Sequence, residues 1–247
     1  MGETFVVSKS GVKVYKRIEY HPLLRGTNTT YPDIIRKAKE TFDKGEEKEL
    51  PKICSENSED ALTWHHFSHL LEAPYKARTR WLAGFLQTAL ERSPSQDLLN
   101  SLDSAYLLFW HGGEVPPFFD PPPSLPFREG RTEVDLAILV HPTAVIFVEA
   151  KYESEISTHS IHSLHRDQII RNIDIGTHHA KQHGYKNFSL ILVADPKLHK
   201  SKAKLDHYKN NPQNILHALP HRQDLKNTAE SLSRELGYLT WDQLPPH

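Results

Sequence analysis

The stretch EVDLAILVHPTAVIFVEAK (residues 133–151) decides the expected fold, because it has the pattern of a β-hairpin with charged residues at one end. Its two apolar halves, residues 134–140 and 144–148, are rich in aliphatic and β-branched side chains, and the proline between them is a common turn former. A three-residue loop is an allowed hairpin length. In that register Asp135 stands directly opposite Glu149, and cross-strand neighbours have Cβ atoms about 4.5–5.5 Å apart. The hairpin therefore brings two carboxylates together.

Two neighbouring carboxylates repel each other, and this repulsion favours a bound cation or a shared proton. Lys151 is two residues beyond Glu149, so both side chains lie on one face of the strand. Magnesium prefers oxygen ligands and usually keeps several waters while it uses one or two carboxylates. A lysine beside the cation can orient or deprotonate the attacking water, or stabilise charge on a phosphate. The cluster thus predicts metal-assisted hydrolysis of a phosphodiester.

The alternative is a surface hairpin that carries an exposed Glu/Lys pair, which would contribute little to stability. Residues 145–148 are too apolar for an exposed edge, so we expect the charges to lie at the end of a buried strand.

Asp135, the apolar hairpin and the triplet Glu149, Ala150 and Lys151 resemble the motif of the PD-(D/E)XK nuclease superfamily, which has the restriction-endonuclease-like fold. The resemblance implies a central mixed sheet flanked by helices, in the core order αβββαβ. It also implies that Asp135, Glu149 and the carbonyl of Ala150 bind Mg²⁺, for which Mn²⁺ substitutes, and that Lys151 acts at the water. The chain departs from the motif at Val134, where the family has a proline.

The resemblance covers about residues 56–196, and the apolar runs in this part follow the expected order. Residues 104–110 are expected to form a first strand, and residues 188–194 a later strand whose continuous apolar character suits burial on both faces. Between the hairpin and the later strand we expect a helix over about 162–184, ended by Gly184. Parallel strands require such a crossover. The expected fold class is therefore α/β, a restriction-endonuclease-like core with an N-terminal addition.

Two of the expected helices contribute further candidate site residues. Gln168 resembles a polar helix residue that faces the site in several branches of the superfamily, with Arg171 one turn away as a phosphate contact. On an earlier helix Ser58 is a suitable N-cap, and Glu59 and Asp60 occupy the first turn. Glu59 resembles the helical glutamate that completes the metal site in many family members. The simpler alternatives are a solvated helix face for Gln168 and the general preference of acids for helix N-termini for Glu59.

The composition fits a globular enzyme. The chain has 247 residues, of which 38% are hydrophobic, enough for one large domain or for one domain with an addition. We expect an N-terminal subregion over 1–52, packed on a nuclease-like domain over 53–247. The mean hydropathy is −0.57, and no apolar run approaches the roughly 18 residues of a membrane span. The single cysteine, Cys54, cannot form an internal disulfide, which favours a reducing, cytoplasmic location.

The net charge is about −1, so contact with nucleic acid would rely on a local basic surface. Residues 9–17 and 197–209 are locally basic, and the second segment follows the last expected core strand. Each is equally consistent with a solvated surface. Residues 112–130 are proline-rich and long for a connection, so we expect either a functional loop or a stiff cover over the core.

Outside the core, a strand-like run over 3–15, a charged helix over 31–44 and a helix over 224–236, ended by Gly237, are expected. The chain is rich in histidine, and His65/His69 and His179/His183 have helical i, i+4 spacing. No cysteine pair or HExxH motif accompanies them, so we do not expect zinc.

The expected function is that of a Mg²⁺-dependent nuclease that hydrolyses phosphodiester bonds in DNA, with Asp135, Glu149, Lys151, Glu59 and Gln168 as its site. One alternative is a catalytically inactive nuclease-fold protein that binds nucleic acid or acts as a scaffold, and another is a nuclease that cleaves RNA. The complete Asp/Glu/Lys set argues against a scaffold. Cutting both strands is compatible with a homodimer, although no residue indicates one.

Overall fold

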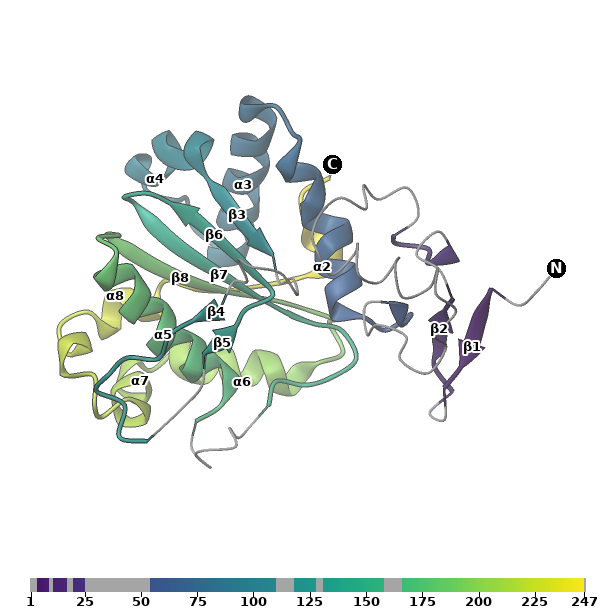
Figure 1. Cartoon of the computed structure of the whole chain (residues 1–247). Helices are drawn as coiled ribbons and strands as arrows, with labels where there is room; N and C mark the ends of the chain where they lie inside the picture. The colour runs from purple at the N-terminus through teal and green to yellow at the C-terminus, as the bar shows by residue number, and fades with distance from the viewer. Residues whose placement is uncertain are drawn as a thin grey trace.

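The computed structural model describes residues 4–8, 11–16, 20–24, 54–109, 118–127, 131–157 and 166–246. These residues form a mixed α/β structure in which helices lie on both faces of a central five-stranded sheet (Figure 1). The strands, in their spatial order, are β3 (Tyr106–Phe109), β6 (Leu136–Val140), β7 (Ala144–Lys151), β8 (Asn187–Ala194) and β9 (Leu236–Thr240). Pairing is antiparallel from β3 to β7 and parallel from β7 to β9. The expected α/β class with a mixed central sheet is thus confirmed.

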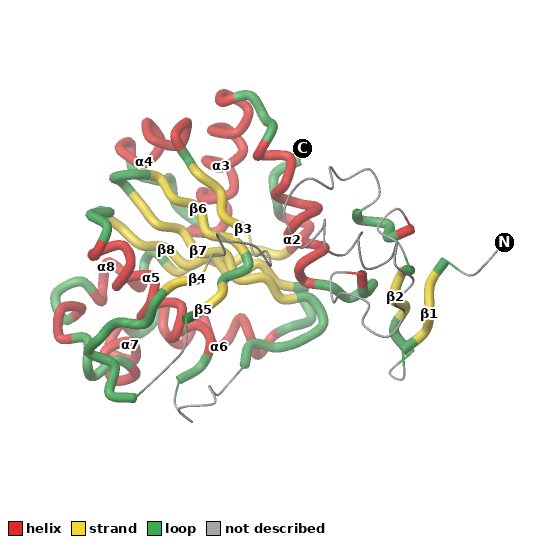
Figure 2. The backbone as a smooth tube through the Cα atoms, in the orientation of Figure 1, coloured by secondary structure: helices red, strands yellow, loops and turns green. Residues whose placement is uncertain are grey.

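The helices divide between the two faces of the sheet, as the tube in Figure 2 also shows. The helices of the first face, with the short 3-10 helices that follow them, are α2 (Glu59–Phe67), η4 (Ser68–Leu71), α3 (Tyr75–Leu90), α4 (Gln96–Ser101) and η5 (Leu102–Ser104). The helices after the hairpin are α5 (Gln168–Gln182), α6 (His199–Lys209), α7 (Pro212–Ala218), η6 (Gln223–Leu225), α8 (Ala229–Ser233) and η7 (Trp241–Gln243).

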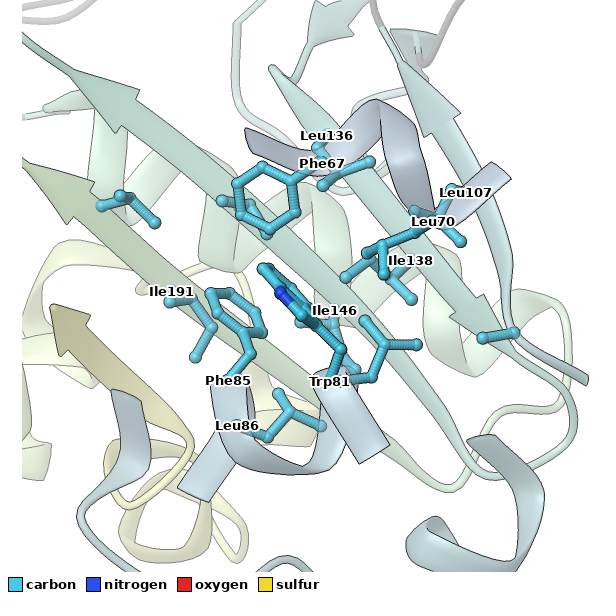
Figure 3. Packing of buried hydrophobic residues seen from close by; sticks show 14 of the residues in the cluster. Phe67, Leu70, Trp81, Phe85, Leu86, Leu107, Leu136, Ile138, Ile146 and Ile191 are labelled. Atoms are coloured by element: carbon cyan, nitrogen blue, oxygen red, sulfur yellow. The ribbon is translucent and has the colours of Figure 1, made fainter. Parts of the chain in front are cut away.

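Successive side chains of the strands point to opposite faces of the sheet and belong to two separate hydrophobic cores. On one face, Ile138 and Ile146 pack with the aromatic side chains of α2 and α3 (Figure 3). There the Trp81 and Phe85 rings stack with their centroids 5.6 Å apart. On the other face, Val145 and Phe147 of β7 pack in a core with residues of α5 and α6. Every residue of β7 is buried, because this strand lies between both helical layers.

The hairpin has the expected register. Leu136 pairs with Val148 and Val140 pairs with Ala144, around a turn at residues 141–143. Since Asp135 precedes the first pair and Glu149 follows it, the two carboxylates lie at the same end of the hairpin. The strand predictions over 134–140 and 144–148 are therefore confirmed.

The expected crossover helix is confirmed as α5, which begins at Gln168 and connects the parallel strands β7 and β8. Asp167 caps its N-terminus, and the positive φ of Gly184, 74°, follows its C-terminal end as expected. Gly176 allows the helix to approach β8 closely, since a Cβ there would lie 2.0 Å from the ring of Phe188. Residues 162–165 of the expected helix lie outside the described residues.

The prediction of one helix over residues 224–236 is wrong. This segment contains η6 and the short α8, and Leu236 then begins strand β9. Gly237 lies within β9 instead of ending a helix. A Cβ at Gly237 would lie 2.5 Å from Ile191 Cδ1 and 2.9 Å from the carbonyl oxygen of Ala89, so glycine serves the close contact of α3 with the sheet.

The expected strand-like run over 3–15 contains two short strands, β1 (Phe5–Val7) and β2 (Lys13–Tyr15), which form an antiparallel hairpin that was not predicted from the sequence. Val14 bridges to Ser55, and Leu24 is fully buried in the same core as α2 and α3. The expected helix over 31–44 lies outside the described residues.

In the proline-rich segment, β4 (Phe118–Phe119) pairs with β5 (Thr132–Glu133), while residues 112–117 and 128–130 lie outside the described residues. None of the helices that the structure describes is long and apolar enough to cross a membrane.

Candidate active site

The candidate site lies at the C-terminal end of β7, where the strand carries Glu149 and Lys151. These residues are only 3% and 6% exposed, so the alternative of an exposed surface pair is wrong. A charge taken out of water at such a position requires a partner. The neighbouring elements supply those partners from α2, from α5 and from the start of β6.

Asp135 is fixed across the end of the hairpin by the backbone. Its Oδ2 accepts a hydrogen bond of 2.7 Å from the N–H of Ala150. Burial and the negative charge of Glu149 hold the pKa of Asp135 well above its usual value, although Lys151 and the Ala150 N–H act in the opposite direction. The two predicted metal-binding carboxylates therefore interact unfavourably in the absence of a cation.

The ammonium group of Lys151 lies among three of the four residues predicted to bind the metal. Its Nζ is 2.9 Å from Glu149 Oε1, 2.9 Å from the carbonyl oxygen of Ala150 and 3.2 Å from Glu59 Oε2. Burial by itself lowers the pKa of Lys151, but Glu149, Asp135 and Glu59 outweigh this effect and the pKa lies above its usual value. The surrounding carboxylates thus favour the protonated form of Lys151.

Glu59 reaches the site from the first turn of α2, whose N-cap is Ser58 as expected. Besides its ion pair with Lys151, Glu59 accepts hydrogen bonds through Oε1 from the Tyr152 N–H, at 3.1 Å, and from Ser154 Oγ, at 2.9 Å. Glu59 therefore ties α2 to the segment that follows β7. The charge of its neighbour Asp60 adds to the upward shift in the pKa of Asp135.

Helix α5 holds Glu149 through two amides. Gln168 Nε2 donates to Glu149 Oε1, and Asn172 Nδ2 donates to Glu149 Oε2 at 2.8 Å. Gln168 thus lies where the sequence predicted, in contact with the site. Asn172 was missed, although its position one turn after Gln168 was a signal that both face the same side. The predicted phosphate contact of Arg171 stays a prediction.

A second residue missed from the sequence is Trp241, which follows β9. Its indole N–H donates to the carbonyl oxygen of Lys151 at 3.1 Å, and the ring of His66 stacks on it with centroids 5.3 Å apart. The N–H of Asp195 donates to the same carbonyl at 3.0 Å. The carbonyl of Lys151 is therefore held by the segments that follow β8 and β9.

Within the described ranges, no group of three or more His, Cys, Asp or Glu side chains is arranged to hold a metal ion. His179 and His183 lie together with ring centroids 4.3 Å apart, and burial with the charges of neighbouring histidines lowers the pKa of His179 to about 4.

The donors near Lys151 suit a hard cation, because they are oxygens with excess negative charge and one ammonium already lies among them. Two carboxylates and a carbonyl are the kind of set that magnesium completes with water.

Comparisons of the chain with protein-family models, with curated proteins and with solved structures gave no match.

Proposed function

We propose that this protein is a Mg²⁺-dependent nuclease of the PD-(D/E)XK type that hydrolyses phosphodiester bonds in DNA. The observation that carries the proposal is the excess of acid around the buried Lys151 at the end of β7, where Glu149 is buried and Asp135 and Glu59 are partly buried. The order of elements, a helix, then β3, β6 and β7, then α5 and β8, supports the restriction-endonuclease-like core.

The residues of the site have separate roles in the proposed hydrolysis. Asp135, Glu149 and the Ala150 carbonyl would hold the cation, which supplies a Lewis acid and a water of lowered pKa. The Ala150 N–H orients Asp135 at 2.7 Å, and the amides of α5 orient Glu149. Lys151 places a positive charge where the phosphate gains negative charge.

The choice of nucleic acid as substrate is based on the basic segment that leads into α6. Lys197 lies two residues beyond Asp195, whose N–H contacts the Lys151 carbonyl, so the basic segment 197–209 begins beside the site. Lys197 Nζ pairs with Glu153 at 3.1 Å and lies over the Tyr152 ring at 5.3 Å. These exposed contacts are weak, which leaves the charge accessible to a phosphate backbone.

A non-catalytic scaffold is the second candidate, and one observation favours it. Both carboxylate oxygens of Glu149 already have donors, and Lys151 Nζ contacts three oxygens, so the cluster is hydrogen-bonded without a metal. Buried ion clusters of this kind occur in proteins as purely structural features.

A cleavage assay separates the two candidates. The full chain is incubated with supercoiled plasmid, single-stranded DNA and single-stranded RNA, with Mg²⁺ or with EDTA. We expect Mg²⁺-dependent cleavage of DNA that falls by on the order of 100-fold in Asp135→Asn and Glu149→Gln. Glu235→Gln is the matched control, because Glu235 contacts Ser189 at 2.8 Å, at the opposite end of the sheet.

Each alternative has its own outcome in this assay. Cleavage of the RNA alone would replace DNA with RNA as the substrate. No Mg²⁺-dependent cleavage of any of the three substrates would remove the nuclease proposal in favour of the scaffold.

A further inference from the structure

Asn172 has an unusual hydrogen-bonding state. The residue is 1% exposed, and its Nδ2 donates to Glu149 Oε2 at 2.8 Å. Its Oδ1 is buried and has no hydrogen-bond partner among the described residues. Buried polar atoms are nearly always paired, so an acceptor of this kind next to a cluster of acids requires an explanation.

The orientation of the amide follows from its neighbour. An amide offers hydrogens at nitrogen and lone pairs at oxygen, and an ionised carboxylate only accepts. Turning the amide over would set Oδ1 against Glu149 Oε2, two acceptors in contact, and would lose the 2.8 Å bond. The free acceptor therefore belongs to Oδ1, which shares its carbon with the nitrogen that holds Glu149.

The two oxygens of Glu149 have different surroundings. Oε1 lies 2.9 Å from Lys151 Nζ and also accepts from Gln168, whereas the hydrogen bond from Asn172 is to Oε2. Asn172 thus holds the carboxylate oxygen that is not the contact of Lys151. Because Asn172 is buried on α5, its hydrogen bond limits rotation of the Glu149 carboxylate.

We propose that Asn172 is a positioning residue of the metal site, which holds Glu149 through Nδ2 and accepts a hydrogen bond from a water of the site through Oδ1. This inference rests on the proposed function, because it assigns the water to a cation held by Glu149 and Asp135. An amide is suited to both contacts, since it donates to an acid and accepts from a water at the same time. Residues that orient metal ligands in this way change metal affinity when they are removed.

The test measures Mn²⁺ binding to the full chain by isothermal titration calorimetry, for the wild type, Asn172→Leu and Asn172→Ala. Leucine keeps the branching and the number of side-chain heavy atoms, adds some volume and removes both polar atoms. We expect Mn²⁺ affinity to fall by roughly 10- to 100-fold in both variants. The thermal midpoint without metal should fall in both variants, because the buried Glu149 Oε2 loses its donor, and it is measured beside the affinity so that only folded protein is compared.

Asn187→Leu is the control, since Asn187 begins β8 at the far end of the sheet and donates to the Thr143 carbonyl at 3.3 Å. Its Mn²⁺ affinity should equal that of the wild type. If leucine at position 172 prevents folding, Asn172→Ala makes the same comparison without added volume.

Two other results contradict the inference, and they differ from each other. If the wild type binds Mn²⁺ and both Asn172 variants bind it equally well, Asn172 is a structural residue and the nuclease proposal stands. If the wild type binds no Mn²⁺, the nuclease proposal and the role of Asn172 fall together.

Discussion

Two polar clusters of this protein, each built around buried charged side chains, make an instructive comparison. The acid-rich cluster consists of Asp135, Glu149, Glu59 and Lys151, at the end of β7. The balanced cluster lies beside α5 and consists of Asp174, Asp224, Arg166, Arg222 and His221. In the balanced cluster Asp174 is fully buried, and its carboxylate lies 2.7 Å from Arg222 and 2.8 Å from Arg166.

The clusters differ in the balance of their charges. In the balanced cluster two guanidinium groups face two carboxylates, and Arg222 lowers the pKa of Asp224 to about 2. In the acid-rich cluster one ammonium faces three carboxylates, and the pKa of Asp135 is raised. Each cluster combines buried and partly exposed side chains, so burial does not separate them. The balanced cluster joins the segment at 221–224 to α5, while the acid-rich cluster lacks positive charge that a cation would supply.

The largest effect is expected in the balanced cluster. Asp174→Asn leaves the buried guanidinium groups of Arg166 and Arg222 without their shared anion, and should lower the free energy of unfolding by about 3–5 kcal/mol. Denaturant unfolding followed by circular dichroism measures it. Added Mn²⁺ should raise the free energy of unfolding by the same amount in the variant and in the wild type. A loss below about 1 kcal/mol in the variant would show that the cluster contributes little to the stability of the fold.

In the acid-rich cluster, Lys151→Met should separate metal affinity from activity. We expect DNA cleavage to fall by about 10²–10³-fold, because the charge at the phosphate is lost. Mn²⁺ affinity should rise, because Lys151 Nζ no longer competes for the oxygens of Glu149, Ala150 and Glu59. Calorimetry and the cleavage assay measure the two effects.

Lys186→Met is the control for this variant, since Lys186 is exposed and pairs with Asp97 at 3.4 Å, far from the site in the fold. A fall in Mn²⁺ affinity in Lys151→Met would contradict the view that the ammonium occupies the position of a cation.

The two clusters should also differ in the pH dependence of stability. The folded pKa of Asp224, about 2, lies below its usual value of 3.8, so its contribution is complete above pH 3.8 and is lost as the pH falls through 2. Asp224→Asn should remove about 1 kcal/mol of this acid-induced loss, because solvent screens the partly exposed carboxylate. Urea unfolding between pH 2 and pH 5 tests it, and an unchanged profile in the variant would exclude Asp224 as the source.

The smallest expected effect is a gain in the stability of the metal-free protein, in contrast to the losses expected in the balanced cluster. Since the folded pKa of Asp135 is raised, its ionisation makes the metal-free protein less stable as the pH rises through that pKa. Asp135→Asn keeps an acceptor for the Ala150 N–H and removes a charge, so it should slightly stabilise the metal-free protein at pH 7.

Thermal unfolding with and without Mn²⁺ checks the Asp135 prediction. Mn²⁺ should raise the melting temperature of the wild type and leave that of the variant unchanged. Destabilisation of the metal-free variant would indicate that Asp135 is a structural ion-pair partner, like Asp174.

Local patterns in the sequence determined much of the fold. Alternation and the turn at Pro142 gave the register that sets Asp135 against Glu149, since strand pairing in a hairpin follows from loop length. Ser58 and Gly184 marked the ends of helices, because capping depends on neighbours in the chain.

Tertiary structure alone decided the contacts between distant segments. Strand β9 was missed because Gly237 suits a helix end locally, and only the approach of Ala89 on α3 explains it within a strand. Likewise, the sequence placed Lys151 next to Glu149, but the contact of its ammonium with Glu59, 92 positions earlier, depends on the packing of α2 on β7. The sequence specified which charges lie on one strand, and the fold decided which of them are buried together and how their charges balance.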